Sequence, residues 1–167
     1  DEISSNELKN RLASLALPVP AKTSNDAISS EVSGKSFTFA QNDKHIQSIT
    51  IQFKDDLCLL NLKTDTASFD FSFASGRWQH GETAKHGPSI FAQAKNNQNG
   101  LPLFKIAQSY TWSDDKTLEL SLRYIENVQS EKIIIKFDEI GKKKILVDFK
   151  ISNSRFNKSL PLEGVMQ

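Results

Sequence analysis

The sequence predicts an all-β fold, an antiparallel meander barrel of about eight to ten strands with a short N-terminal helix. Most of the chain beyond residue 34 alternates apolar and polar side chains, which is the period of a half-buried strand. Short turns rich in acids or glycine separate the alternating runs, as in β-hairpins. So many consecutive hairpins must hide their edges, and the meander order favours a closed barrel over a sandwich.

The N-terminal helix is predicted over residues 4–17. Ser4 and Glu7 form the capping-box pattern Ser-x-x-Glu at its start. Three leucines follow at helical spacing, at i, i+4 and i+7: Leu8, Leu12 and Leu15. An amphipathic helix of this length is therefore expected before the first strand.

The helix is expected to end at "LPVP", residues 17–20, because proline cannot continue a helix. Residues 21–33 are small and polar, and we interpret them as a linker. This predicts two parts, the helix and linker at 1–32 and the barrel domain at 33–167.

The predicted strands place apolar side chains at every second position, so that one face of each strand is dry. Eleven phenylalanines are available to fill the interior of the barrel. Residues 84–105 break the pattern, and a short strand is expected near 89–95. The expected inward positions are Phe37, Phe39, Ile49, Ile51, Phe53, Cys58, Leu60, Leu62, Phe69, Phe71, Phe73, Leu118, Leu120, Leu122, Tyr124, Ile133, Ile135, Phe137, Ile145, Val147, Phe149 and Ile151.

Composition excludes several classes of function. The net charge of +1 gives no electrostatic footprint for nucleic acid. No run approaches the ~18 apolar residues of a membrane span. The single cysteine, Cys58, excludes an internal disulfide and is interpreted as a buried thiol. The chain begins at Asp1 rather than methionine, and we interpret it as a processed or excised fragment.

Residues with reactive side chains do not form a recognisable catalytic motif. His80, Glu82 and His86 give the spacing H-x-E-x3-H, but zinc proteases need H-E-x-x-H on a helix. We therefore interpret them as polar residues at a strand end and predict no metal or cofactor. Ser113 begins "SDDK", which matches S-x-x-K only formally because it lies at a hairpin tip. Cys58 lies within a strand and is not expected to be catalytic.

Four aromatic residues are candidates for a ligand cavity or for the core: Trp78, Tyr110, Trp112 and Tyr124. The core is favoured for all four, since buried aromatic side chains usually serve packing. Their polar tips then need hydrogen-bond partners, which Arg77, Arg123 or a carboxylate would supply.

Six stretches occur in an order and spacing that resemble one known family. They are "SLALPVP" at 14–20, "SGKSFTFAQND" at 33–43, "IQSITIQF" at 46–53, "GRWQHGET" at 76–83, "YTWSDDKTLELSLRYIEN" at 110–127 and "PLEGV" at 161–165. Together they resemble the accessory C-terminal domain that follows the catalytic domain in bacterial β-lactamase-related serine hydrolases, above all those of the Bacteroidetes. The positions that match the family pattern are Ser33, Gly34, Lys35, Phe37, Phe39, Asn42, Gly76, Trp78, Gly81, Thr83, Trp112, Asp114, Thr117, Leu118, Leu120, Arg123, Tyr124 and Glu126.

The resemblance implies a noncatalytic module with a lipocalin-like barrel. In that family the catalytic serine and lysine lie in the upstream domain, so no catalytic residue is carried over to this chain. The implied partner is the parent serine hydrolase domain, on which the module packs or whose assembly it mediates, and homo-oligomerisation is left open. The implied compartment is the periplasm or cell envelope. The alternative is a lipocalin-like carrier that binds an apolar small molecule inside the barrel.

Within "GRWQHGET" the resemblance selects Gly76, Trp78, Gly81 and Thr83, whereas His80 is at a free position. The stretch is therefore interpreted as a tryptophan anchor between two glycine bends. The family pattern also asks for arginine at position 123. This predicts a bidentate contact from Arg123 to a carboxylate on a facing strand, such as Asp70 or Asp148.

Overall fold

The computed structural model describes residues 2–13, 17–87, 102–126, 130–137, 143–152 and 160–167. Two helices and ten strands lie within these ranges. They are α1 (Glu2–Ala13), α2 (Asp26–Val32), β1 (Lys35–Phe39), β2 (Ile46–Lys54), β3 (Leu57–Thr64), β4 (Ser68–Ser75), β5 (Gln79–Thr83), β6 (Phe104–Asp114), β7 (Thr117–Tyr124), β8 (Ser130–Phe137), β9 (Lys144–Ile151) and β10 (Leu162–Met166).

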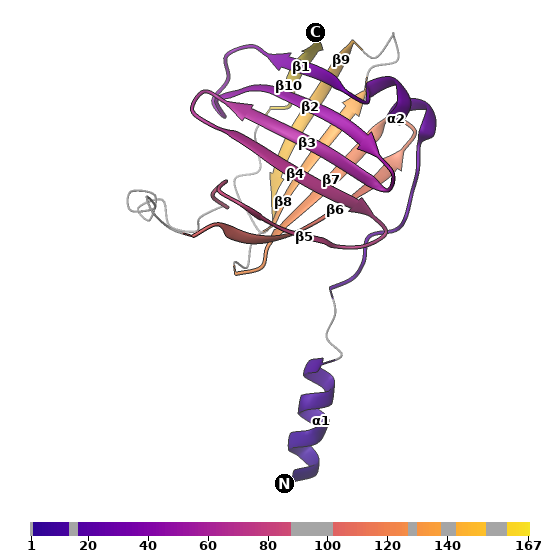
Figure 1. Cartoon of the computed structure of the whole chain (residues 1–167), viewed down its shortest axis with the longest axis vertical. Helices are drawn as coiled ribbons and strands as arrows, with labels where there is room; N and C mark the ends of the chain where they lie inside the picture. The colour runs from indigo at the N-terminus through magenta and orange to yellow at the C-terminus, as the bar shows by residue number, and fades with distance from the viewer. Residues whose placement is uncertain (1, 14–16, 88–101, 127–129, 138–142, 153–159) are drawn as a thin grey trace.

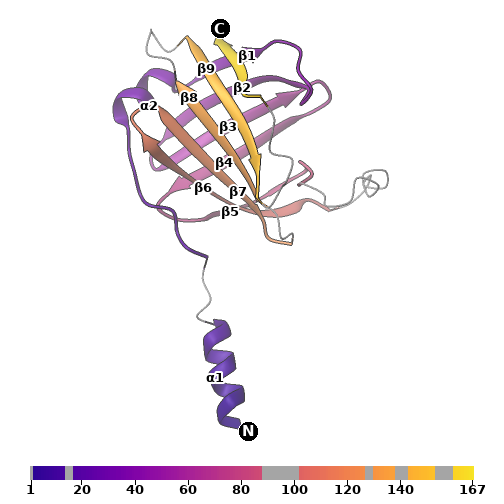
Figure 2. The ribbon, with the colours of Figure 1, turned by 180° about the vertical axis from the view of Figure 1, so that it is seen from behind.

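The strands form a closed barrel of nine strands, with β5 as an additional strand alongside β6 (Figures 1 and 2). Neighbours in sequence pair antiparallel from β1 to β4 and from β6 to β10, and β10 returns to pair with β1. The ring closes through a short parallel contact between β4 and β6 at Ala74↔Ser109 and Ser75↔Tyr110. The predicted meander barrel is confirmed.

The predicted alternation also holds, because the apolar side of each strand faces the interior. Side chains on the dry faces of β3, β7 and β8 are almost fully buried, with Leu60, Leu120 and Ile133 at most 1% exposed. Phenylalanines fill much of the interior: Phe37, Phe71, Phe73 and Phe137 are buried, and Phe39, Phe53, Phe69, Phe104 and Phe149 pack against them.

The N-terminal helix exists, with different bounds from those predicted. It runs over Glu2–Ala13, and Leu15 falls outside the described residues. Figures 1 and 2 show α1 extending away from the barrel. Leu8 and Leu12 are 58% and 57% exposed, so their predicted apolar stripe has no partner within the described chain.

The interpretation of residues 21–33 as a linker is wrong, because Asp26–Val32 form α2. Asn25 caps this helix by accepting a hydrogen bond from the Ile28 backbone N–H (3.2 Å). Ile28 and Val32, four residues apart, are buried in the main core. The boundary between 1–32 and 33–167 therefore cuts through the hydrophobic core of the barrel. The helix is only seven residues long, too short for its periodicity to stand out from the polar residues around it.

Helix α2 covers one end of the barrel, beside the hairpin that joins β6 to β7 (Figure 1). The Asn25 side-chain amide donates to the Asp115 carbonyl of that hairpin (2.7 Å). The short strand expected near 89–95 lies outside the described residues. No helix in the described ranges is long and apolar enough to cross a membrane.

Candidate functional site

The segment that precedes α2 lies on the outside of the barrel, and we call residues 17–25 the connector. Trp78, which follows β4, donates from its indole Nε1 to the Pro18 carbonyl (3.2 Å). The Arg123 guanidinium of β7 lies over the Trp78 ring, 5.5 Å from its centroid. A groove of about 250 Å³ at this contact is lined by Pro18, Val19, Pro20, Trp78, Ser121, Arg123, Ser130, Glu131 and Lys132.

Thr23 attaches the connector more firmly than Trp78 does. Its hydroxyl oxygen accepts from the Trp112 backbone N–H (2.6 Å) and lies 3.0 Å from the Thr111 hydroxyl. Its carbonyl accepts from the Ser75 hydroxyl (3.1 Å). These bonds join the connector to β4 and β6 at the point where the two strands meet. The connector therefore has a fixed path on the barrel.

Gly76 is the residue that lets the connector approach so closely. Its φ of 68° is in the left-handed region, which glycine adopts without strain. A Cβ at this position would lie 2.7 Å from the Lys22 Cβ. The expected glycine bend before Trp78 agrees with this geometry, whereas Gly81, expected to form the second bend, lies within β5 opposite Ile106.

We expect Thr23→Val to lower the free energy of unfolding by about 1–3 kcal/mol, because the Trp112 N–H would lose its acceptor. Valine keeps the shape of threonine, so packing changes little. Ser24→Ala, at the exposed neighbouring position, is the control and should change stability by less than about 0.5 kcal/mol. Urea melts measure both variants. Equal effects would mean that Thr23 does not hold the connector.

The contact predicted for Arg123 is corrected by the structure. Its neighbour is the face of Trp78, whereas Asp70 accepts from Asn61 (2.7 Å) and Asp148 lies 3.7 Å from Lys150. Arg123 is exposed on the outer face of β7, and Trp78 is only half-buried rather than part of the core. Strand parity placed Arg123 on the face opposite Leu122 and Tyr124, but it could not reveal that the segment after β4 brings the Trp78 indole to this position.

Tyr110 and Trp112 are buried, as the sequence predicted, at the barrel end beneath α2. Phe53 packs edge-to-face on Tyr110 (ring centroids 5.9 Å apart) and stacks on Trp112 (6.1 Å). Phe137 also packs on Trp112 (5.8 Å). These rings occupy the space that a ligand would need at this end, so both residues serve the core.

Tyr124 is buried at the opposite end of the barrel, beside an ion pair that the sequence analysis missed. The Lys85 ammonium contacts both carboxylate oxygens of Glu131, at 2.8 and 2.6 Å. The Tyr124 hydroxyl lies 3.5 Å from the same ammonium. The side chains of the pair are only 19% and 13% exposed. Burial, and next the negative charge of Glu131, raise the pKa of Tyr124 well above its ordinary range.

The segment after β5 folds over this end and brings Lys85 inward. The Lys85 backbone N–H donates to the Thr83 hydroxyl (3.0 Å), which turns the chain. His86 packs edge-on against Phe104 (5.3 Å), and Phe104 packs against Tyr124 (6.2 Å). Aromatic and charged side chains therefore gather at this end of the barrel.

The reactive residues examined in the sequence are not arranged for catalysis. His80 and Glu82 are exposed on β5, whereas His86 packs on Phe104. Within the described chain, no three His, Cys, Asp or Glu side chains gather closely enough to hold a metal ion. The Ser113 hydroxyl donates to the Thr117 carbonyl (3.4 Å) rather than to a base. Cys58 is fully buried, and burial raises the pKa of its thiol far above 9.0, its ordinary value.

The burial of Cys58 predicts a specific loss of stability at alkaline pH. The thiol stays protonated in the native state but ionises in the unfolded state above pH 9.0. Unfolding then releases a proton, so the stability that Cys58 contributes falls with rising pH by about 1.4 kcal/mol per unit. Cys58→Ala removes this dependence. The difference in urea stability between wild type and Cys58→Ala should therefore shrink above pH 9; a constant difference would contradict the burial.

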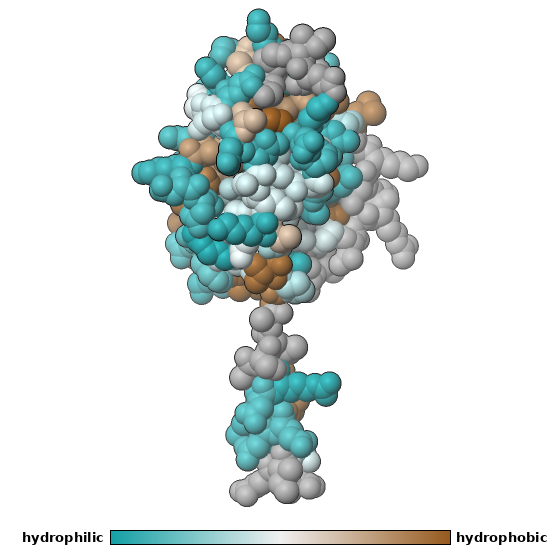
Figure 3. All heavy atoms as spheres, turned by 90° about the vertical axis from the view of Figure 1, so that its right-hand side faces the viewer, coloured by the Kyte–Doolittle hydropathy of each residue, from teal (hydrophilic) through white to brown (hydrophobic). Residues whose placement is uncertain are grey.

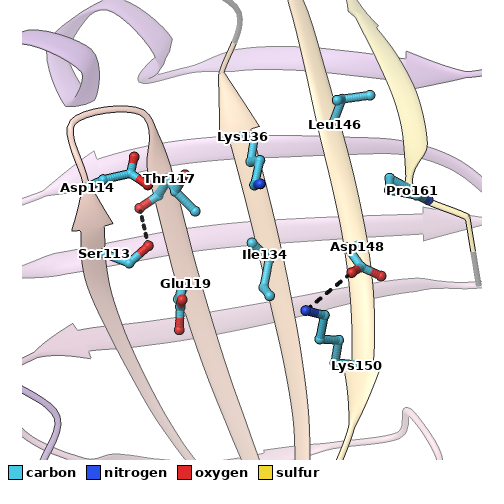
Figure 4. Close-up of a pocket in the computed structure, with 10 residues that line it drawn as sticks. All are labelled: Ser113, Asp114, Thr117, Glu119, Ile134, Lys136, Leu146, Asp148, Lys150 and Pro161. Carbon is cyan, nitrogen blue, oxygen red and sulfur yellow. Dashed lines mark hydrogen bonds and ion pairs between the residues drawn. The ribbon is translucent and has the colours of Figure 1, made fainter. Parts of the chain in front are cut away.

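A groove of about 360 Å³ lies on the outer face of β6–β9 (Figure 4). Ile134 lies opposite Asp148 and Leu146 opposite Lys136, so the two apolar side chains are set among charged ones, and Lys150 lies 3.7 Å from Asp148. On the side of the molecule drawn in Figure 3, hydrophilic residues separate the apolar ones into small patches. The groove of Figure 4 has the mixed character of an ordinary protein surface.

Comparison with family models and with curated proteins finds no match for this chain. The resemblance stated above therefore rests on the sequence motifs alone.

Proposed function

We propose that this chain is a noncatalytic accessory domain of a serine hydrolase, packing beside the catalytic domain that precedes it. The observation that carries the proposal is the fixed path of the connector. Thr23 and Trp78 bond residues 17–25 to the barrel, so the chain on the N-terminal side of the barrel starts from a fixed position on its surface. Such attachment suits a module that shapes access to a neighbouring site.

The exposed leucines of α1 support the same proposal. Leu8 and Leu12 lie on one side of α1. Both are exposed, and α1 shares no hydrophobic core with the described part of the barrel. An apolar stripe of this kind is stable when it packs against another domain. In the proposed protein α1 packs on the hydrolase domain, and the connector sets the distance to the barrel.

The packing of the described interior residues supports the accessory domain over the carrier. A carrier needs a cavity that encloses most of its ligand. Here α2 covers one end of the barrel, the Lys85–Glu131 pair lies across the other, and phenylalanines occupy the space between. An apolar dye such as 1-anilinonaphthalene-8-sulfonate should not bind with one-to-one stoichiometry; saturable binding of that kind would favour the carrier.

We expect the isolated chain to show no serine hydrolase activity. The test is labelling with a fluorophosphonate probe, together with turnover of p-nitrophenyl acetate and of a chromogenic cephalosporin. Signals should equal those of the heat-denatured protein and should be the same for Ser113→Ala and Cys58→Ala. Turnover that disappears in either variant would refute the proposal.

A further inference from the structure

Strands β4 and β5 are the first and last strands in the order of the ten-stranded sheet, and they diverge from each other. On the side away from β3, β4 pairs only through Ala74 and Ser75. Strand β5 pairs with the first half of β6, so it takes the place that β4 would otherwise fill. The described chain therefore leaves the first part of β4, Ser68–Phe73, without a strand on that side.

Backbone groups on this side of β4 are available for hydrogen bonding. The Ser72 N–H points away from β3, since it donates to the Gln108 side-chain oxygen (2.9 Å). The Ala74 carbonyl points the same way, since it accepts from the Ser109 hydroxyl (2.9 Å). Backbone groups of an antiparallel strand alternate with a period of two residues. The N–H and C=O groups of Ser68 and Asp70 therefore point to this open side as well.

Gln108 adds an unsatisfied donor at the same place. Its side chain lies on the inward face of β6 and is 3% exposed. The amide oxygen accepts from Ser72, but the described residues offer no hydrogen-bond acceptor to the amide nitrogen. That nitrogen lies against Gly81, where an added Cβ would be 3.0 Å from it. Since this buried amide nitrogen has no acceptor among the described residues, a ligand oxygen could satisfy it.

Asp70, Ser72 and Gln108 line a groove of about 440 Å³, which extends from β5 across β4 to residues of β2 and β3. Asp70 and Glu82 contribute carboxylates to its two walls, and Leu59 and Phe71 contribute apolar surface. A strand edge with free backbone groups is a site for the addition of another strand. The carboxylates select positively charged side chains on that strand.

We propose that this groove binds an extended basic peptide segment, which adds to the free edge of β4 as a further strand. The peptide backbone pairs with Ser68 and Asp70, and one of its carbonyls accepts from the Gln108 amide. Its lysine or arginine side chains lie beside Asp70 and Glu82. A saccharide fits less well, since the groove offers no exposed Phe, Tyr or Trp ring and Phe71 is only 4% exposed. The site is separate from the connector and does not rest on the proposed function.

The test uses the full chain and a fluorescein-labelled, end-capped peptide of sequence Thr-Lys-Thr-Lys-Val-Thr, whose two lysines share one face of an extended strand. Titration by fluorescence anisotropy should show saturable binding, and NMR should show shifts of the Ser68 and Asp70 amides and of the Gln108 side-chain NH₂. Asp70→Lys should weaken binding at least about tenfold, that is about 1.4 kcal/mol. Asp43→Lys changes an exposed acid outside the groove by the same charge and should retain most of the affinity.

A second peptide separates strand addition from simple charge attraction. The same sequence with every backbone nitrogen methylated keeps both lysines but has no N–H group to pair with the β4 edge on either side. Its affinity should fall at least about tenfold. Equal affinity of both peptides, equal losses in Asp70→Lys and Asp43→Lys, or no binding would each overturn the proposal. Binding of chitotriose at these residues in place of the peptide would overturn it in favour of a sugar site.

Discussion

Val32→Asp is expected to unfold the barrel or leave it barely folded. Val32 is 0% exposed and packs from α2 into the core that the strands form. An aspartate there would bury a carboxylate without a partner, at a cost of at least about 4 kcal/mol. This is a large part of the stability of a typical domain. Circular dichroism and urea melts would show the loss.

Two further variants keep this test interpretable if Val32→Asp does not accumulate. Val32→Ala removes two methyl groups and should cost about 2 kcal/mol, which a melt can measure. Ser30→Asp places the same charge on the exposed side of α2 and should change stability by less than about 0.5 kcal/mol. Wild-type stability of Val32→Asp would mean that α2 separates freely from the barrel and that residues 21–33 act as a linker after all.

Glu131→Ala is expected to lower the free energy of unfolding by about 3 kcal/mol, because it leaves the Lys85 ammonium without its partner. The Lys85 side chain is 19% exposed and contacts both oxygens of Glu131, so water replaces the carboxylate poorly. The variant should also loosen the segment that folds over this end of the barrel. Urea melts give the stability, and hydrogen exchange of the Lys85 backbone amide reports the local effect.

Glu119→Ala is the matched control for this prediction. Glu119 forms an ion pair with Lys132 of β8 at 2.7 Å, but the Lys132 side chain is 46% exposed. Its loss should cost about 0–1 kcal/mol. The double variant Lys85→Met with Glu131→Leu removes both charges and should recover most of the stability that Glu131→Ala loses. Equal costs for Glu131→Ala and Glu119→Ala would show that water reaches the Lys85 ammonium freely at its end of the barrel.

The barrel could be predicted because the pattern that marks each strand lies in residues that are neighbours in sequence. A period of two assigns a face to each residue from its immediate neighbours, which is why the interior positions from Phe37 to Val147 were correct. Closure followed from the order of the hairpins. Helix α2 could not be found this way, since only Ile28 and Val32 mark its buried side.

The contacts of the candidate sites depend on residues far apart in sequence. Thr23 meets Trp112, and Trp78 meets Arg123, only after the ring has closed. One signal for two further residues was nevertheless present in the sequence. Gln108 and Glu131 are polar residues at inward positions of otherwise alternating strands. Such a residue needs a buried partner, and here the partners are the Ser72 N–H and Lys85.

The central claim is that this barrel is the noncatalytic part of a serine hydrolase. The most direct measurement is fluorophosphonate labelling of the native gene product from its source cells, followed by peptide mapping of the labelled serine. The account predicts one labelled serine in a domain that precedes Asp1 and no label within residues 1–167. A label on Ser113 or on another serine of this chain, or a native product without a labelled upstream domain, would contradict it.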